Sequence, residues 1–249
     1  MKKLLLIAVA LACGALGLSA QTTDYQAILA RIDAQTNFLQ EGLSTAVTMV
    51  TDKPGKDRSV TKARMFRRDH DKKFLILIEQ PDSQKGEGYL QINDNLKFYD
   101  PNTRIFSHTS LKEKFNESHA DNDDFSSSKL ATDYTVTNGE AGNLGKFEVY
   151  ILTLAATNDQ VVYPMKKIWV TRDKNLLLKA EDYSLSQRLM RTNLYTNYQA
   201  VDGRYIPLSM LFIDNLNIGE KTQMTMSEVA VGKIPDKVFT EAYVEQVSK

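Results

Sequence analysis

The sequence contains a single cysteine, Cys13, only three histidines, and equal numbers of basic and acidic side chains, 31 of each. One cysteine excludes an intrachain disulfide and leaves no cysteine pair for a zinc site. A balanced charge lacks the clustered excess of basic side chains that nucleic-acid binding requires, so we expect no nucleic-acid partner. Beyond the N-terminal segment, no stretch approaches the roughly 20 apolar residues that a membrane-spanning helix needs.

Residues 1–20 have the pattern of a secretory signal peptide. Lys2 and Lys3 form a positive segment, an apolar run follows, and small residues lead to Ala20 immediately before the polar chain begins at Gln21. We therefore expect cleavage after Ala20 and export to the periplasm. Cleavage removes two of the 31 basic residues and no acidic residue, which leaves 29 basic and 31 acidic side chains and a net charge of −2.

Cys13 permits a second interpretation of the same segment. Ala12 before it and Gly14 after it fit a lipobox, in which cleavage leaves an acylated cysteine at the N-terminus. In the usual lipobox pattern, the leucine lies one residue farther from the cysteine than Leu11 does here. We favour ordinary cleavage after Ala20, with lipid anchoring to the envelope through Cys13 as the alternative.

The remaining residues, 21–249, are predicted to form one domain that opens with a helix over 24–40. Apolar side chains recur on one face of this helix at Tyr25, Ile28, Leu29, Ile32 and Leu39. Thr23 and Gln26 have the spacing of a capping box, and Gly42 lies where a helix stop is expected. A helix with one apolar stripe must pack against another element.

Nearly everything after this helix has the pattern of short strands separated by turn residues such as Pro54-Gly55. The predicted strands are 43–52, 59–68, 73–79, 88–92, 95–99, 105–108, 133–136, 147–154, 167–171, 176–184, 189–198, 205–213 and 221–231. Such spacing predicts a mainly β fold built on a large antiparallel sheet that curls or closes. Segments 74–78 and 208–213 are apolar on both faces, which indicates strands covered on both sides.

Two segments between these strands are predicted to be surface connections, 116–128 and 137–145. The first contains Asp121, Asp123 and Asp124, which could serve a hard cation, but it lacks the glycine turn and terminal glutamate of an EF-hand loop. We therefore predict a solvated, mobile loop and no metal site.

Recognisable catalytic chemistry is missing from the sequence. His70 lies in a charged run that resembles an exposed turn, His119 lies in the polar loop, and His108 ends a strand beside serines. Neither G-x-S-x-G nor H-E-x-x-H occurs. Glu181 and Asp182 are adjacent in a predicted strand and should point to opposite faces. We expect a binding protein that is not an enzyme and needs no cofactor.

Several segments, in this order, resemble the LolA/LolB-type outer-membrane lipoprotein-sorting family. They are 85–90 (KGEGYL), 95–101 (NLKFYDP), 123–126 (DDFS), 130–134, 167–170 (KIWV), 178–183 (LKAEDY), Arg191, 204–207 (RYIP), 213–215 (IDN), 234–236 (IPD) and 239–240. The resemblance implies an open, strongly curved antiparallel half-barrel with helices across its concave face. Neither the gating arginine nor the hydrophobic insertion loop of that family can be placed in this sequence.

The resemblance also implies a periplasmic carrier or receptor, a monomer, that binds the acyl chains of lipoproteins or phospholipid in an apolar cavity and meets inner- or outer-membrane sorting components. Candidate cavity-lining residues are Ile28, Leu29, Ile32, Tyr89, Phe98, Trp169, Met190, Leu194, Met210 and Phe212. For each of them, packing in an ordinary core is the competing interpretation. Two other functions remain open: an envelope structural or partner-binding protein with a filled interior, and a lipid esterase centred on His108.

Overall fold

The computed structural model describes residues 23–248. The signal peptide predicted over 1–20 and the lipidation of Cys13 lie outside these residues. Between residues 23 and 248, no helix combines the length and the apolar character that crossing a membrane requires.

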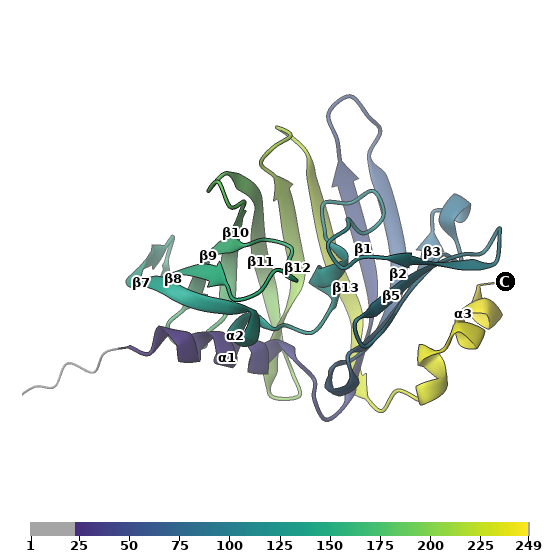
Figure 1. Ribbon diagram of the computed structural model, residues 1–249, viewed down its shortest axis with the longest axis horizontal. Helices are drawn as coiled ribbons and strands as arrows, with labels where there is room; N and C mark the ends of the chain where they lie inside the picture. Colours follow the sequence, from purple (N-terminus) through teal and green to yellow (C-terminus); the bar gives the residue numbers. More distant parts are fainter. Residues whose placement is uncertain (1–22, 249) are drawn as a thin grey trace, which may run out of the picture.

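One antiparallel sheet of thirteen strands dominates the described chain (Figure 1). The strands are β1 (Gly42–Asp52), β2 (Ser59–Arg68), β3 (Lys73–Gln80), β4 (Gly88–Ile92), β5 (Asn95–Asp100), β6 (Ile105–Thr109), β7 (Tyr134–Leu144), β8 (Phe147–Ala156), β9 (Met165–Thr171), β10 (Leu177–Tyr183), β11 (Leu189–Val201), β12 (Arg204–Asp214) and β13 (Lys221–Gly232). All thirteen predicted strands are present. The mainly β fold class is therefore confirmed.

The order of strands in the sheet is β6-β5-β4-β3-β2-β1-β13-β12-β11-β10-β9-β8-β7. The chain starts at the centre with β1 and moves strand by strand to the edge strand β6. It then crosses to the opposite edge at β7 and returns to the centre, where β13 pairs with β1. The sheet does not close, because β6 and β7 remain its two edges. It is the open half-barrel that the family resemblance implied.

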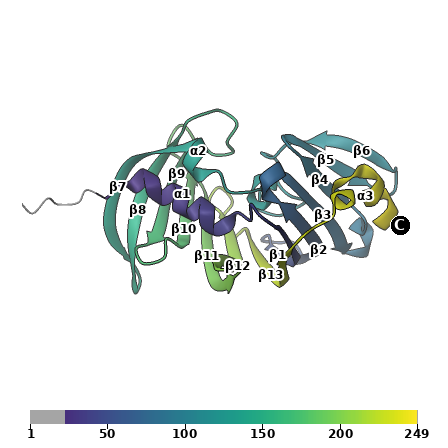
Figure 2. The same cartoon turned by 90° about the horizontal axis from the view of Figure 1, so that it is seen from below.

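Helix α1 (Tyr25–Thr36) lies across the concave face of the half-barrel (Figure 2). It contacts both β7 and β12, which four strands separate in the sheet, so the sheet must curve around it. Ile28, Leu29 and Ile32 are buried beneath it with side chains of β8, β9 and β10. The apolar stripe predicted from helical spacing is thus the packing face of the helix.

Both predicted ends of this helix are wrong. Asp24 is the N-cap and accepts a hydrogen bond from the backbone N–H of Ala27, whereas the Gln26 amide is bonded to the backbone of β7. The helix stops after Thr36, and Phe38 is buried in place of Leu39, which is 55% exposed. Phe38 is held because its N–H donates to the buried carboxylate of Asp69 at 2.7 Å.

The segment that joins the two sheet edges, residues 110–129, is named here the crossover segment. Residues 116–128 of it were predicted to form a solvated, mobile loop, and the prediction that they are solvated is wrong. Phe115, Ala120 and Phe125 are buried in the core cluster over the concave face of β1–β5. Its C-terminal part leads into α2 (Leu130–Asp133), whose first N–H groups donate to Asp33 of α1 at about 3 Å. Helix α1 and the crossover segment therefore cover the concave face together.

The outer face of the β2–β5 half is covered by the C-terminal residues, which include α3 (Glu241–Val247) after a 3-10 turn, η4 (Asp236–Phe239). Leu75 and Leu90 pack there against Phe239 and Val244. Phe74, on the same strand as Leu75, packs on the concave side. The prediction that segment 74–78 is covered on both faces is confirmed.

Residues 137–144, predicted to be a surface connection, instead extend β7 to Leu144. The glycines that suggested a loop serve close packing. A Cβ atom on Gly139 would lie 2.5 Å from the ring of Tyr25, and one on Gly142 would lie 2.8 Å from Ile151. Gly139 therefore lets the first turn of α1 approach the strand, where Tyr25 packs edge-on against Tyr150.

We expect Gly139→Ala to destabilise the protein by about 1–3 kcal/mol, because the Tyr25 ring and the start of α1 must shift. Gly232→Ala is the matched control, since a Cβ atom there meets nothing within 4 Å. Urea unfolding of both variants measures the difference. If Gly139→Ala and Gly232→Ala had equal free energies of unfolding, the close approach of Tyr25 to β7 would not be required for stability.

Candidate functional site: a cavity beneath the crossover segment

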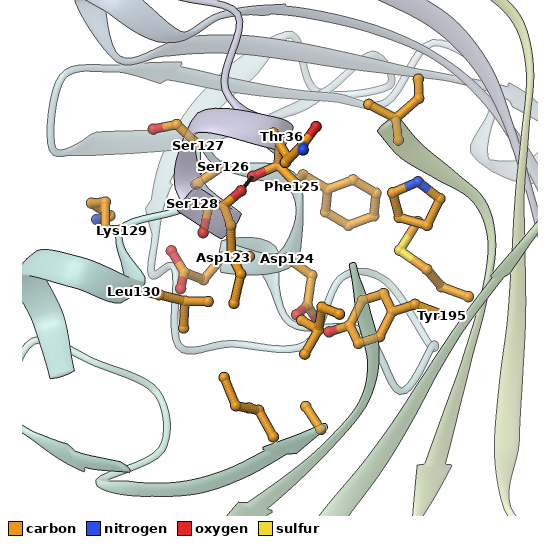
Figure 3. A pocket seen from close by; sticks show the side chains of 18 of the residues that line it. Thr36, Asp123, Asp124, Phe125, Ser126, Ser127, Ser128, Lys129, Leu130 and Tyr195 are labelled. Carbon is orange, nitrogen blue, oxygen red and sulfur yellow. Dashed lines mark hydrogen bonds between the residues drawn. The ribbon is translucent and has the colours of Figure 1, made fainter. Parts of the chain in front are cut away.

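A cavity of about 230 Å³ lies between the concave face of the sheet, the end of α1 and the crossover segment (Figure 3). Its sheet side is formed by apolar side chains from strands that meet at the centre of the sheet. They include Val47, Met65, Ile206, Met210, Met224 and Met226. Ile32 and Thr36 of α1 and residues 123–130 close the other side. The space is thus bounded by segments far apart in the sequence.

Only two of the ten predicted lining residues, Ile32 and Met210, line this cavity. Ile28 and Leu29 are fully buried between α1 and the sheet. The remaining inward-facing aromatic residues form packed core, in which Tyr89 contacts the rings of both Phe98 and Phe115. Phe212 belongs to the same cluster. Whether any of the ten binds a ligand stays a prediction.

Trp169 and Leu194 point to the outer face of the sheet. Their strand neighbours Ile168 and Tyr195 line the cavity, and adjacent side chains of a strand alternate between faces. The Trp169 ring lies under the ammonium group of Lys179, 4.3 Å from its centroid. Met190, half-buried, is the extra residue of a bulge between β10 and β11. For these three residues, ordinary packing fits the structure better than cavity lining.

A buried ion network fastens the crossover segment to the sheet beside the cavity. The guanidinium group of Arg191 on β11 binds Asp124 through two N–H···O contacts, of 2.6 and 3.1 Å. It also lies 3.0 Å from Asp121. In addition, it donates to the backbone carbonyl of His119 at 3.2 Å. One side chain thus holds three residues of the crossover segment.

The sheet supplies the counter-charges for this network. Asp182 on β10 is fully buried and accepts from Arg191 at 3.0 Å, from Lys166 at 2.6 Å and from the amide of Asn193 at 2.7 Å. Lys114, in the crossover segment, binds Asp121 at 2.7 Å. Three cations and three carboxylates therefore balance in a region from which water is largely excluded, which is the condition under which buried charges are tolerated.

These contacts set the ionisation of the network. Burial acts to raise the pKa of Asp182, but the charges of Lys166 and Arg191 outweigh it and lower that pKa to about 2. Burial acts to lower the pKa of Lys166, and Asp182 outweighs it and raises that pKa. Burial raises the pKa of Asp121 despite Arg191, and it also raises the pKa of Asp123, which lines the cavity. The cavity lining thus includes the cations Lys166 and Arg191 beside the apolar side chains of the sheet, and Asp121 and Asp123, both with a raised pKa, on the crossover side.

Sequence reasoning missed this network. The sequence pattern indicates Asp121 and Asp124 only as candidate cation ligands in a loop, and it predicts no role for Arg191. A signal was present, because Arg191 and Asn193 occupy alternate positions of a strand whose neighbours are largely apolar. Polar residues on the core face of a strand indicate buried partners. The identity of those partners could not be read from the sequence.

His108 and His119 both have polar side-chain partners in the structure. On β6, Nδ1 of His108 is 3.0 Å from the Oδ1 atom of Asn95. His119 lies between the Thr222 hydroxyl, at 3.1 Å, and the Glu220 carboxylate, at 2.9 Å. That order of groups resembles a hydrolytic triad. Thr222, however, is fully buried and bonded to Thr51, so its hydroxyl cannot meet a carbonyl carbon.

The fold is shared with three solved structures. A LolA superfamily protein from Nitrosomonas europaea superposes with a TM-score of 0.76 at 24% identity, over 88% of this chain and 98% of that one. A putative outer membrane lipoprotein-sorting protein domain from Vibrio parahaemolyticus gives 0.77 at 19%, over 88% and 97%. A DUF1329 family protein from Desulfovibrio piger gives 0.76 at 20%, over 88% and 97%. The protein therefore has the LolA-type fold, and the resemblance noted in the sequence is confirmed at that level.

No curated protein sequence matches the chain. A family model described as "Uncharacterized protein" matches residues 70–246, which is more than half of the sequence. The chain belongs to that family. The match covers the strands from β3 to β13 and both carboxylates of the crossover segment that bind Arg191.

We expect Asp182→Asn to cost about 3–5 kcal/mol of stability at pH 7, because it leaves Lys166 and Arg191 short of one buried counter-charge. The folded-state pKa of Asp182, about 2, lies below its unfolded value of about 3.9. Its stabilisation is therefore present above about pH 5 and is lost as the pH falls toward 2. Urea unfolding at several pH values should show that the difference in free energy of unfolding between wild type and variant becomes smaller over that range.

Asp202→Asn is the control, since Asp202 is an exposed turn residue whose contact with Arg204 is loose, at 3.7 Å. We expect it to change stability by less than about 0.5 kcal/mol. The role assigned to the Asp182 charge would be contradicted if wild type and Asp182→Asn differed in free energy of unfolding by the same amount down to pH 2.

Proposed function

We propose that the protein is an exported carrier or receptor that holds the acyl chains of lipoproteins or phospholipid in the cavity beneath the crossover segment, without catalysis. The observation that carries this proposal is an apolar cavity at the centre of the concave face, closed by α1 and the crossover segment. The LolA-type fold supports it, because one structure that shares the fold is described as a putative lipoprotein-sorting domain.

The lining suits a flexible apolar ligand. Met65, Met210, Met224 and Met226 all face the space, and the unbranched, polarisable methionine side chain adapts to ligands of varied shape. Each methylene of an acyl chain that leaves water for such a site contributes about 0.8 kcal/mol. A chain of modest length therefore binds without a charged anchor.

The size of the cavity indicates how it would be used. At about 230 Å³ it is smaller than the roughly 300–1,000 Å³ of typical ligand pockets. A full acyl chain therefore needs α1 and the crossover segment to move outward from the sheet. Because α1 is bonded to residues 128–131 through Asp33 and Asn37, the two would move as one cover. The described structure fits the closed form of such a carrier.

The small volume also favours one competing function, a partner-binding envelope protein. Phe115 and Phe125 fill the concave face of the β1–β5 half with packed rings. In that case the cavity is a packing gap and the crossover segment is a permanent part of the core. Binding of acyl chains separates the two functions.

The place of action is part of the proposal. The signal-peptide pattern of residues 1–20 puts the protein in the periplasm, with cleavage after Ala20 or, alternatively, acylation of Cys13. As a monomer in this compartment, it would receive its ligand from one membrane-bound sorting component and pass it to another. Intact-mass measurement of the protein from its own envelope distinguishes an N-terminal Gln21 from a lipidated Cys13.

We expect Met210→Trp to weaken binding of a fluorescent fatty-acid probe at least tenfold, because the indole ring occupies the space that the ligand needs. Leu194→Trp is the matched control, since this residue lies on the outer face of the neighbouring strand β11. Equilibrium fluorescence titration gives both affinities, and circular dichroism confirms that the variants fold.

Native mass spectrometry of wild-type protein from its own envelope provides the second measurement. Co-purified phospholipid or acylated polypeptide supports the carrier. Protein that carries no lipid and also fails to bind the probe contradicts it and favours the partner-binding function.

A further inference from the structure

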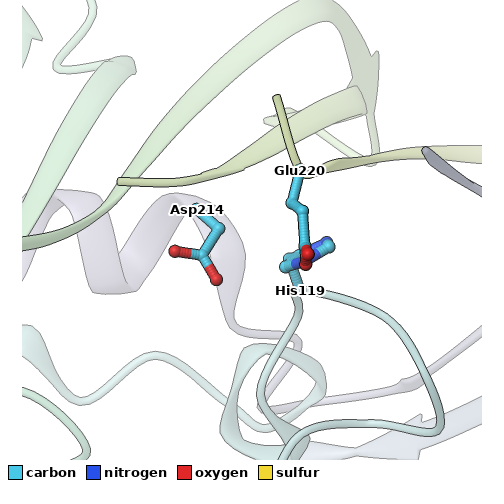
Figure 4. A group of neighbouring side chains, drawn as sticks. All are labelled: His119, Asp214 and Glu220. Carbon is cyan, nitrogen blue, oxygen red and sulfur yellow. The ribbon is translucent and has the colours of Figure 1, made fainter. Parts of the chain in front are cut away.

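Three side chains outside the cavity come together where the crossover segment meets the hairpin between β12 and β13 (Figure 4). They are His119, Asp214 and Glu220, and their nearest nitrogen and oxygen atoms all lie within 4.8 Å of one another. We propose that this group, named here the hairpin triad, binds a divalent transition-metal ion of the Zn²⁺ class. This inference does not depend on the proposed acyl-chain binding.

Hydrogen bonds hold the two carboxylates next to each other, from the hairpin itself for Asp214 and from His119 for Glu220. Asp214 ends β12, and its carboxylate accepts from the backbone N–H groups of Leu216 and Asn217 at 2.7 and 3.0 Å. The N–H of Asp214 donates to the carbonyl of Glu220 at 3.1 Å, which closes the turn. Two carboxylates six residues apart are therefore fixed next to each other before any ion binds.

The imidazole of His119 is pre-oriented from the other side. It is buried, with only 5% of the residue exposed, and the backbone N–H of His119 donates to the Thr222 hydroxyl at 3.0 Å. Nδ1 faces the same hydroxyl at 3.1 Å, so that Nε2 points to the two carboxylates. Metal-binding histidines are commonly held in this way, with one ring nitrogen bonded to a neighbouring group and the other left for the ion.

The hydrogen bonds around Thr222 are compatible with the tautomer that a metal requires. With the proton on Nδ1, His119 donates to Thr222, and the Thr222 hydroxyl donates in turn to Thr51 at 2.8 Å. Nε2 then presents its lone pair. Without an ion, the same nitrogen carries the proton and donates to Glu220 at 2.9 Å. The buried groups need only two changes in bonding, the transfer of the ring proton from Nε2 to Nδ1 and a reversal of donor and acceptor between Thr222 and Thr51.

The donor set selects the kind of ion. One imidazole nitrogen and two carboxylate oxygens suit Zn²⁺ and its neighbours, whereas Ca²⁺ and Mg²⁺ prefer oxygen ligands alone. Zinc ligands lie about 2.0–2.2 Å from the ion, so separations of up to 4.8 Å need shifts of only about 1 Å to fit. A doubly charged ion would also neutralise the two carboxylates.

Such an ion would join two segments about a hundred residues apart in the sequence. His119 belongs to the crossover segment, and its carbonyl already accepts from Arg191. Asp214 and Glu220 belong to the sheet. A bound ion would therefore fasten the middle of the crossover segment to the rim of the sheet and slow its detachment.

The test is thermal unfolding of the untagged protein after chelator treatment, with and without Zn²⁺. At a free Zn²⁺ concentration a hundred times the dissociation constant, linkage predicts a rise in Tm of about 5–10 °C. Glu220→Gln and Asp214→Asn, which keep the shapes and most hydrogen bonds of the site, should lose this rise. His70→Gln is the matched control and should keep it, because His70 is exposed and pairs only loosely with Asp71, at 3.9 Å.

Two further measurements keep the proposal falsifiable if a variant is unstable. Co²⁺ bound to wild-type protein should give a visible absorption band that Zn²⁺ displaces, and Zn²⁺ should slow amide hydrogen exchange in residues 115–125. A wild-type Tm that does not respond to Zn²⁺, or an equal response in Glu220→Gln, would overturn the metal site. The hairpin triad would then be only a histidine–carboxylate hydrogen bond.

Discussion

The contact of Arg191 with three carboxylates determines how the concave face of this protein is built. Asp182 comes from the sheet, and Asp121 and Asp124 come from the crossover segment, so one guanidinium group spans both layers. Buried charges carry a large desolvation cost, and removing any member leaves the others uncompensated. The crossover segment can therefore leave the sheet only if several charges separate together. The crossover segment would therefore either stay fully bound to the sheet or detach completely. This behaviour suits the proposed carrier, whose closed cavity is too small for a full acyl chain.

Acidic side chains of the crossover segment lie beside the apolar side chains that line the cavity. Methionine side chains of three strands contribute to the sheet side of the cavity, while the crossover segment brings Asp121, Asp123 and Asp124 to its margin. Burial and the neighbouring carboxylate of Asp124 both raise the pKa of Asp123, which lines the cavity. The proposed hairpin triad includes His119 of the same segment. The ion network, the cavity and the hairpin triad therefore all include residues of the twenty-residue crossover segment.

Local patterns were sufficient to predict the strands, because alternation and turn residues are properties of neighbouring positions. The errors occurred where distant contacts decide the outcome. Gly139 and Gly142 indicated a loop, yet they are glycines because Tyr25 and Ile151 press against β7. The acidic residues of the crossover segment indicated a solvated loop, because their partners could not be seen in the local sequence. Those partners lie on β11 and within the segment itself. Of the predicted lining residues, Ile32 and Met210 face the cavity, but spacing alone cannot distinguish them from Ile28 or Phe212, which fill the core.

The pairing of β1 with β13 has a consequence for how the chain acquires its structure. Thr45 bonds to the carbonyl of Ser227 across 182 residues, and this is where the two halves of the sheet join. Because a chain is synthesised from its N-terminus, one edge of β1 stays unpaired until β13 is available. Contacts between such distant residues slow folding, and unpaired strand edges invite association with other chains. The centre of the sheet can therefore be completed only when nearly the whole chain has been made.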